Sequence, residues 1–261
     1  QRVVGNEFKG YDKYYLIGGN TAWANIRSIL GQNINGLRIL EEGYWKASRV
    51  DVWGISDYDL FKEANELFAA RNPQQPFLAV IQAASYHSPY TVPETPGFTP
   101  HEATEEDLRN YGFESQEEYN SMRFTDFALG EFIRWAKTAG YYHNTVFFIL
   151  GDHGLNDKVN NMPEGYINAR LAPWHTPMLI HAAPELGLIA PGESMTPASQ
   201  VDVFPTAAGL AGIAYNDWGL GRDLFDARYD GSRQVYIGGK DTEPIHLIDG
   251  DYCYLDNRAG E

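Results

Sequence analysis

Residues Thr145 to Gly154 read Thr-Val-Phe-Phe-Ile-Leu-Gly-Asp-His-Gly, and this stretch is the most informative one for the fold. Its five consecutive apolar residues, rich in β-branched and aromatic types, predict a strand buried on both faces, as in a parallel sheet. Gly151 permits a sharp turn, and Asp152 and His153 follow it. They stand at the carboxyl end of the strand, where ligands collect in open α/β sheets.

Carboxylate and imidazole side by side are both ligand types for a divalent metal such as Zn²⁺ or Mn²⁺. Asp152 and His153 are therefore candidate metal ligands. An isolated Asp-His pair also occurs in ordinary turns at strand ends, so the metal interpretation depends on the other motifs of the chain.

Composition limits the function classes. The net charge of −15 and the lack of a Lys/Arg cluster argue against nucleic-acid binding, so an anionic substrate needs a metal or a local Arg. Cys253 is the one cysteine and forms no internal disulfide. No apolar run approaches the roughly 20 residues that span a bilayer. The chain begins at Gln1 without Met, and we expect it to be a piece of something longer.

Hydrophobic periodicity predicts alternating strands and helices. Further strands are expected over residues 14–17, 77–82 and 178–181, with short tail strands over 235–238, 246–248 and 252–255. Helices are expected over 21–30, 58–71 and 121–139, with a short one ending at Gly212. Loops are expected over 33–43, 91–118 and 155–171.

This order predicts an α/β fold, a mostly parallel sheet flanked by helices on both faces, with a small C-terminal β appendage. Strand 77–81, helix 121–139 and strand 146–150 are expected to form one right-handed crossover of parallel strands. We place the α/β domain at residues 1–225 and the appended strands at 226–261.

The segment after the first strand holds three candidate residues. Thr21, at the expected helix start, is either an N-cap or a nucleophile at an anion-binding helix end. Trp23 and Arg27 are four residues apart, so one helix face would present an indole and a guanidinium to the same ligand. The alternative is a core Trp and a solvated Arg.

Histidines follow or precede two other strands. His87 follows strand 77–82 and is placed to face the same crevice as the Asp152-His153 pair if the strands are neighbours. His175 precedes strand 178–181 and reaches the crevice only if that strand runs antiparallel or the preceding loop folds back. His181 is interpreted as a satisfied strand-end histidine. Asp202 is expected to cap or orient the helix that follows it.

Three motifs taken together resemble the sulfatase and alkaline phosphatase superfamily: 151–154 (Gly-Asp-His-Gly), 175–177 (His-Thr-Pro) and 200–206 (Gln-Val-Asp-Val-Phe-Pro-Thr). Residues 19–27, 53–61 and 140–146 look like its lipoteichoic acid synthase branch, which includes phosphoglycerol transferases of bacterial envelopes. The resemblance runs from about residue 13 to 225 and implies the C-terminal portion of a catalytic domain.

The resemblance also implies roles. Asp152 and His153 match the ligands of a single Mn²⁺, with Zn²⁺, Mg²⁺ and Ca²⁺ as alternatives. His87 matches a histidine of the substrate pocket and is the candidate catalytic residue, while Trp23 and Arg27 match, less closely in spacing, groups that hold glycerol phosphate. His175 matches a second-metal or phosphate ligand of other superfamily members, which leaves one metal or two open.

The family's threonine nucleophile and metal-binding glutamate have no match in residues 1–14, and the formylglycine pattern of sulfatases is missing. We therefore expect the fragment alone to be inactive. The intact protein is expected to be a metal-dependent phosphoglycerol transferase or phosphodiesterase that acts on an anionic glycerophospholipid. The alternatives are a sulfatase or phosphomonoesterase of the same superfamily, a non-catalytic binding domain with this fold, and an unrelated metal-binding α/β domain.

The expected location also follows from the resemblance. Such domains lie on the extracytoplasmic face of a bacterial membrane, periplasmic or at the cell surface, tethered by segments absent from this sequence. The expected partners are a glycerophospholipid or another phospho- or sulfo-ester and the membrane, and no nucleic acid.

Overall fold

The computed structural model describes residues 4–154, 162–216, 219–229, 234–238 and 245–256. The chain forms two compact units. The first spans residues 8–145, and the second spans 146–261 together with residues 2–7.

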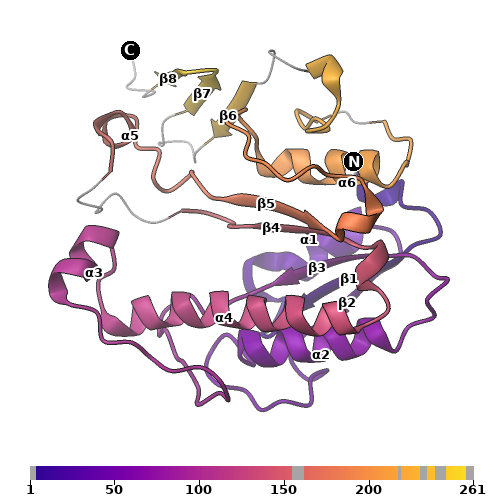
Figure 1. The fold of residues 1–261 in the computed structure, drawn as a ribbon, viewed down its shortest axis with the longest axis horizontal. Helices are drawn as coiled ribbons and strands as arrows, with labels where there is room; N and C mark the ends of the chain where they lie inside the picture. The colour runs from indigo at the N-terminus through magenta and orange to yellow at the C-terminus, as the bar shows by residue number, and fades with distance from the viewer. Residues whose placement is uncertain (1–3, 155–161, 217–218, 230–233, 239–244, 257–261) are drawn as a thin grey trace. The chain divides into compact units, whose positions relative to one another are not determined.

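The first unit is built on a parallel three-stranded sheet (Figure 1). The central strand β1 (Asp12–Ile17) pairs in parallel with β2 (Leu37–Leu40) on one side and with β3 (Phe77–Gln82) on the other. Five of the six β1 residues are buried, as expected of a strand with a partner on each side. Parallel pairing brings the carboxyl ends of all three strands to one edge of the sheet.

Two long helices cover this sheet. Helix α2 (Asp57–Ala69) packs along α4 (Gln116–Thr138), and Figure 1 shows the two side by side. Each buries one stripe at i, i+4 spacing, with Leu60, Phe61, Ala64 and Phe68 on α2, and Phe124, Ala128, Phe132 and Ala136 on α4. The stacked rings of Phe61 and Phe132 lie 5.2 Å apart between centroids. Two shorter helices complete the unit, α1 (Ile26–Asn33) and α3 (Glu105–Tyr111).

The second unit holds two antiparallel sheets. Strand β4 (Val146–Leu150) pairs with β5 (Met178–Ala182), and β6 (Gln234–Gly238), β7 (Ile245–Asp249) and β8 (Tyr252–Asp256) form a three-stranded meander. Its helices are α5 (Glu164–Asn168) and α6 (Val203–Leu210). His246 on β7 is fully buried and its Nε2 lies 2.6 Å from the Ala169 carbonyl oxygen, which joins the meander to the end of α5.

The expected α/β class, parallel sheet, flanking helices and C-terminal strands are confirmed. Strand β2 lies in a segment expected to be a loop, and α3 and α5 were also not expected. Part of the expected loop at 155–171, residues 155–161, lies outside the described residues. The domain boundary at residue 225 stays a prediction.

Two expectations about the central strand were wrong. The recorded partners are β1 for β3 and β5 for β4, so the expected parallel crossover from 77–81 to 146–150 is not among the strand pairs of the described residues. Each residue of β4 is partly exposed rather than buried on both faces. Among the described residues, β4 pairs along one edge only, with the antiparallel strand β5. Strand β5 is itself accessible to solvent, since its Leu179 side chain is 58% exposed.

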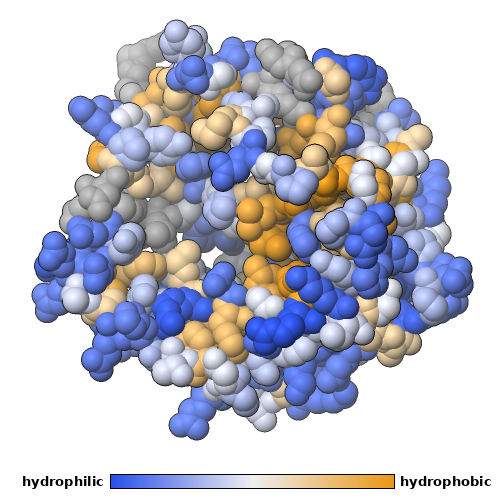
Figure 2. Space-filling view, viewed as in Figure 1, coloured by the Kyte–Doolittle hydropathy of each residue, from blue (hydrophilic) through white to orange (hydrophobic). Residues whose placement is uncertain are grey.

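Hydrophobic side chains gather over β4 and β5 on the face shown in Figure 2. Within the described residues, no helix is both long and apolar enough to cross a membrane.

Candidate functional site

The first group of candidate residues follows the carboxyl ends of the parallel strands. Gly18 and Gly19 follow β1, Glu41 follows β2, and a loop carrying His87 follows β3. The two glycines are required by close packing, since a Cβ at Gly19 would lie 2.5 Å from the Trp53 carbonyl oxygen. Short polar loops thus meet at one edge of the sheet, which is where ligands bind in an α/β fold.

Three aromatic rings form a chain at this edge. The Trp53 ring lies 3.9 Å from the His87 imidazole and 5.5 Å from the Trp23 ring, between centroids. Trp23 is 54% exposed, and His87 is exposed as well. Exposed aromatic groups held together at strand ends form a surface on which an apolar part of a ligand can rest.

Arg27 pairs with Glu41 rather than with the aromatic rings. The Glu41 carboxylate also accepts hydrogen bonds from the Thr21 backbone N–H, at 2.7 Å, and from the Thr21 hydroxyl. Thr21 is fully buried, whereas the Arg27 side chain is 60% exposed. A guanidinium has five N–H donors, so Arg27 keeps donors for an anion while Glu41 fixes its orientation.

The expected single helix over 21–30 was wrong. Residues Trp23–Asn25 form one 3₁₀ turn, α1 begins at Ile26, and Ala24 and Asn25 have positive φ angles of 49° and 58°. The kink removes the i, i+4 relation of Trp23 and Arg27, because that relation requires unbroken helix. Thr21 caps neither helix, since its hydroxyl donates to Glu41.

Asp57 holds the loop that leads to His87. Its carboxylate accepts the backbone N–H of Ala84 (2.8 Å), the N–H of Ser85 (3.1 Å) and the hydroxyl of Thr125 on α4 (2.8 Å). The side chain is 1% exposed. Burial raises the pKa of the Asp57 carboxyl above its usual value, while the hydrogen bonds from Ala84, Thr125 and Ser85 act in the opposite direction.

The raised pKa makes the stability of the fold depend on pH. The native state holds the Asp57 proton more tightly than the unfolded chain, so this residue contributes stability that falls as pH rises from about 4 towards the raised native pKa. We expect Asp57→Asn, which keeps an acceptor oxygen for Ala84 and Ser85, to flatten that fall. Urea unfolding at several pH values measures it. Asp126→Asn, at an exposed site on α4, is the control and should leave the pH profile unchanged.

The second group lies in the other unit, at the end of β4. Asp152 and His153 are exposed, and Asp152 Oδ1 lies 4.0 Å from His153 Nε2. His153 Nδ1 lies 3.0 Å from the Gly154 carbonyl oxygen. A carbonyl only accepts, so this contact selects the tautomer with the proton on Nδ1 and leaves the Nε2 lone pair available.

His175 lies at the same end of this two-stranded sheet. Antiparallel pairing places Leu150 opposite Met178, so the start of β5 adjoins the turn after β4. A Cβ at Gly154 would lie 2.9 Å from the His175 carbonyl oxygen. Strand β5 therefore runs antiparallel to β4, which is one of the two arrangements that the sequence analysis required for a role of His175. Its imidazole packs against the Tyr166 ring, 5.3 Å away between centroids.

The donor set fits a divalent metal. Asp152 Oδ1 and His153 Nε2 lie 4.0 Å apart, so the two side chains must move closer together to bind one ion with bonds of about 2.0–2.2 Å at a tetrahedral angle. The Nδ1 contact with the Gly154 carbonyl is the kind of second contact that orients metal-binding histidines. Among the described residues, no group of three or more His, Cys, Asp or Glu side chains is arranged to hold a metal. These two side chains are thus a partial ligand set.

Gln200 positions this turn, a role that the motif over residues 200–206 did not reveal. Its Nε2 lies 2.7 Å from both the Gly151 and the Asp152 carbonyl oxygens. Gln200 is itself held in a capping box, in which Ser199 N–H donates to the Asp202 carboxylate at 2.7 Å. The Asp202 carboxylate thus closes the capping box of the 3₁₀ turn Gln200–Asp202 and makes no side-chain cap bond to α6, the helix that it was expected to cap or orient.

Removing the Gln200 amide should loosen the metal-binding turn. We expect Gln200→Ala to weaken Mn²⁺ binding by about 10- to 100-fold, the range for lost supporting contacts. Thermal unfolding should change little because Gln200 is exposed. Titration calorimetry with Mn²⁺ checks the first point, and Gln200→Glu, which keeps the length but offers no N–H, should behave like Gln200→Ala. Unchanged affinity in both variants contradicts this role.

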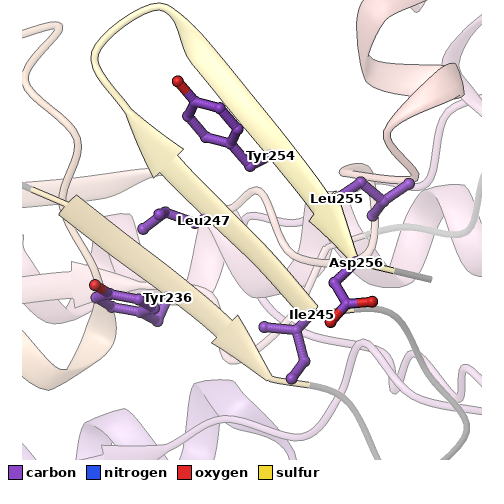
Figure 3. A pocket seen from close by; sticks show the side chains of 6 residues that line it. All are labelled: Tyr236, Ile245, Leu247, Tyr254, Leu255 and Asp256. Atoms are coloured by element: carbon purple, nitrogen blue, oxygen red, sulfur yellow. The ribbon is translucent and has the colours of Figure 1, made fainter. Parts of the chain in front are cut away.

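A separate cavity lies on one face of the C-terminal meander (Figure 3). Its volume is about 280 Å³, and its lining is mostly apolar and phenolic, formed by Tyr236, Ile245, Leu247, Tyr254, Leu255 and Asp256. It contains none of the residues proposed from the sequence as site residues.

Residues 7–213 match the Sulfatase family model, and the chain belongs to the sulfatase family. It is 28% identical over 217 residues to the lipoteichoic acid synthase of Staphylococcus saprophyticus, covering 78% of this chain and 30% of the relative. It is 31% identical over 179 residues to the lipoteichoic acid synthase of Staphylococcus aureus, covering 66% of this chain and 26% of that protein. The chain thus spans less than a third of the length of these curated relatives.

Solved structures of the same fold agree. An alkaline phosphatase superfamily protein from Vibrio parahaemolyticus matches with a TM-score of 0.71 at 22% identity, covering 97% of this chain and 59% of that one. A lipoteichoic acid synthase from Listeria monocytogenes matches with a TM-score of 0.71 at 18% identity, covering 98% of this chain and 67% of that one. At these identities the likeness shows the fold.

Proposed function

We propose that the intact protein is a metal-dependent phosphoglycerol transferase of the bacterial envelope, or a phosphodiesterase acting on a related substrate. The group would come from an anionic glycerophospholipid and pass to a glycan or polymer acceptor. The observation that carries this proposal is the ring chain at the strand ends, in which half-buried Trp53 contacts the exposed rings of Trp23 and His87. The exposed Arg27 follows Trp23 by four residues. It occurs in a sulfatase-family chain related to lipoteichoic acid synthases.

Each proposed substrate-binding residue has its own chemical role. Arg27, oriented by Glu41, donates its remaining N–H groups to phosphate oxygens. Trp23 offers an indole surface to the glycerol carbons. The His87 imidazole is exposed and is proposed to donate a proton to the leaving or non-bridging oxygen. His175 is proposed as a further donor to a phosphate oxygen.

Asp152 and His153 are proposed to hold the metal, with Mn²⁺ as the first candidate. When bound, the metal supplies charge neutralisation at phosphorus and lowers the pKa of the attacking hydroxyl. That hydroxyl is proposed to belong to a threonine outside this sequence. The glycerophospholipid substrate, the membrane contact and the extracytoplasmic location are all part of the proposal.

Ligand binding by the chain itself separates phosphate from sulfate esters. We expect glycerol phosphate to shift the indole N–H resonances of Trp23 and Trp53, and methyl sulfate to shift them less, because a phosphate monoester carries more charge towards Arg27. Arg27→Ala should weaken glycerol phosphate binding by about 10- to 100-fold, the loss expected for charge-assisted hydrogen bonds of roughly 1.5–3 kcal/mol. The measurement is a two-dimensional NMR titration with Mg²⁺ present.

Arg38→Ala is the matched control, since Arg38 lies on β2 and contacts the Tyr14 ring instead. It should leave the affinity for glycerol phosphate unchanged. Equal or tighter binding of methyl sulfate favours the sulfatase alternative over the proposal.

A further inference from the structure

The loop that follows β3 and carries His87, residues 83–90, is called the His87 loop. It is exposed at its tip and held by hydrogen bonds at its base. It follows β3, and its residues from Ser88 to Pro89 are exposed along with His87. An exposed histidine on a loop would ordinarily sample many orientations, which weakens both binding and proton transfer. The contacts of the loop therefore decide whether His87 is preorganised.

Asp57, at the C-terminal end of the neighbouring segment 53–57, forms hydrogen bonds with loop residues that precede His87. Asp57, the first residue of α2, accepts the Ala84 and Ser85 backbone N–H groups at 2.8 and 3.1 Å. In return, its own backbone N–H donates to the Ser85 hydroxyl at 3.0 Å. Three hydrogen bonds thus connect one buried residue to two consecutive loop residues.

Trp53, at the N-terminal end of segment 53–57, contacts the loop at and just after His87. The Trp53 indole N–H donates to the Ser88 carbonyl oxygen at 2.7 Å, while its ring lies against the imidazole. Trp53 is itself fixed, because its backbone N–H donates to the Asp51 carboxylate at 2.8 Å. The following Gly54 has φ 105°, and a Cβ there would lie 2.0 Å from the Gly18 carbonyl oxygen.

A third fastening comes from α4. The hydroxyls of Tyr86 and Tyr90 lie 3.2 and 3.4 Å from one Glu118 carboxylate oxygen. Burial, reinforced by the Glu118 carboxylate, raises the pKa of the Tyr86 phenol and that of the Tyr90 phenol. Both hydroxyls therefore stay neutral hydrogen-bond donors at physiological pH. Residues on both sides of His87 are therefore tied to the scaffold, and the imidazole at the tip meets Trp53.

We propose that residues 53–57 act as a clamp in which Trp53 and Asp57 are positioning residues that hold His87 in a single orientation. Trp53 also sets the spacing between His87 and Trp23, since its ring contacts both. The clamp gives the role of His87 a structural basis. Its relevance to phosphoester binding rests on the proposed function, whereas the orientation of His87 does not.

The test is the NMR chemical shift of the His87 ring protons in this chain without ligand. At 3.9 Å the Trp53 ring should move those protons from their positions in an unstructured peptide. Asp57→Leu, which removes every acceptor, should return them most of the way. Asp57→Asn, which keeps an acceptor for Ala84 and Ser85, should leave them close to the parent values.

Trp53 variants give the second measurement and remain decisive if Asp57→Leu fails to fold. Trp53→Phe keeps a ring but removes the N–H bonded to Ser88, so we expect the His87 shift to be reduced and His87 amide exchange to rise. Tyr44→Phe, at an exposed ring elsewhere, should change nothing. An unchanged His87 signal in folded Asp57→Leu, or in Trp53→Phe, overturns the clamp.

Glycerol phosphate titration of the same variants separates the two proposals. Loss of the His87 shift together with about 10- to 100-fold weaker binding supports both, in line with the cost of small misplacements of binding groups. Loss of the shift with no glycerol phosphate binding by the parent chain supports the clamp and contradicts the proposed function.

Discussion

Asp152→Ala and His153→Ala should each abolish most divalent metal binding by this chain. Each variant removes one of two ligand atoms that lie 4.0 Å apart, and the exposed carboxylate or imidazole that remains cannot hold the ion alone. We expect the Mn²⁺ affinity to fall by more than about 100-fold, beyond the range seen when only a supporting contact is lost. Titration calorimetry or the electron paramagnetic resonance signal of free Mn²⁺ measures it.

The controls remove the same chemical groups elsewhere. Asp251→Ala takes away an exposed carboxylate in the last turn of the meander, and His101→Ala takes away an exposed imidazole in the first unit. Both should bind Mn²⁺ like the parent chain. If the Asp152 and His153 variants bind as tightly as these controls, the metal assignment is wrong and the turn interpretation of the Asp-His pair takes its place.

His87→Ala should lower turnover by the full-length protein by about 10²- to 10⁴-fold, the usual contribution of a positioned general acid. The imidazole is exposed, so its loss should leave folding intact. His87→Gln keeps an N–H donor without a titrating proton, and should restore substrate affinity while turnover stays low. Steady-state kinetics on phosphatidylglycerol vesicles checks both variants.

This result separates two roles for His87. A purely binding role predicts that His87→Gln recovers kcat as well as KM. His101→Ala should behave like the parent protein, and an equal loss of activity there would point to a general effect of removing surface imidazoles.

The strands of the fold were predictable because their apolar runs are dense. Residues 77–82 and 146–150 have the predicted bounds, and all three tail strands are present. Strand β2 was missed because Leu37–Leu40 is only four residues long and is interrupted by Arg38. Such short runs carry little periodic signal.

The kink after Trp23 had almost no signal in the sequence. Ala24 is the strongest type of helix former, yet it adopts a positive φ of 49°. Only Asn25, a residue that tolerates the left-handed region, hinted at a break. Glu41 was missed for a different reason, since an adjacent pair of glutamates after an apolar residue is typical of a solvated turn.

The site was predictable in parts. The strand-end rule placed His87 and the Asp152-His153 pair in loops at carboxyl ends of strands, and the structure agrees. Trp53 and Asp57 were singled out only as part of the family-like motif over residues 53–61, because their contacts with the His87 loop join residues about 30 positions apart. Ser56 accepts the capping bond from Asp59 N–H, which freed the Asp57 carboxylate for that loop.

Turnover by the full-length protein tests the central claim most directly. We expect release of diacylglycerol from phosphatidylglycerol that depends on added Mn²⁺, with little hydrolysis of an aryl sulfate under the same conditions. Efficient aryl sulfate hydrolysis without diacylglycerol release would contradict the phosphoglycerol transferase account and support the sulfatase alternative. Binding of glycerol phosphate with no turnover of either ester would leave a non-catalytic binding domain.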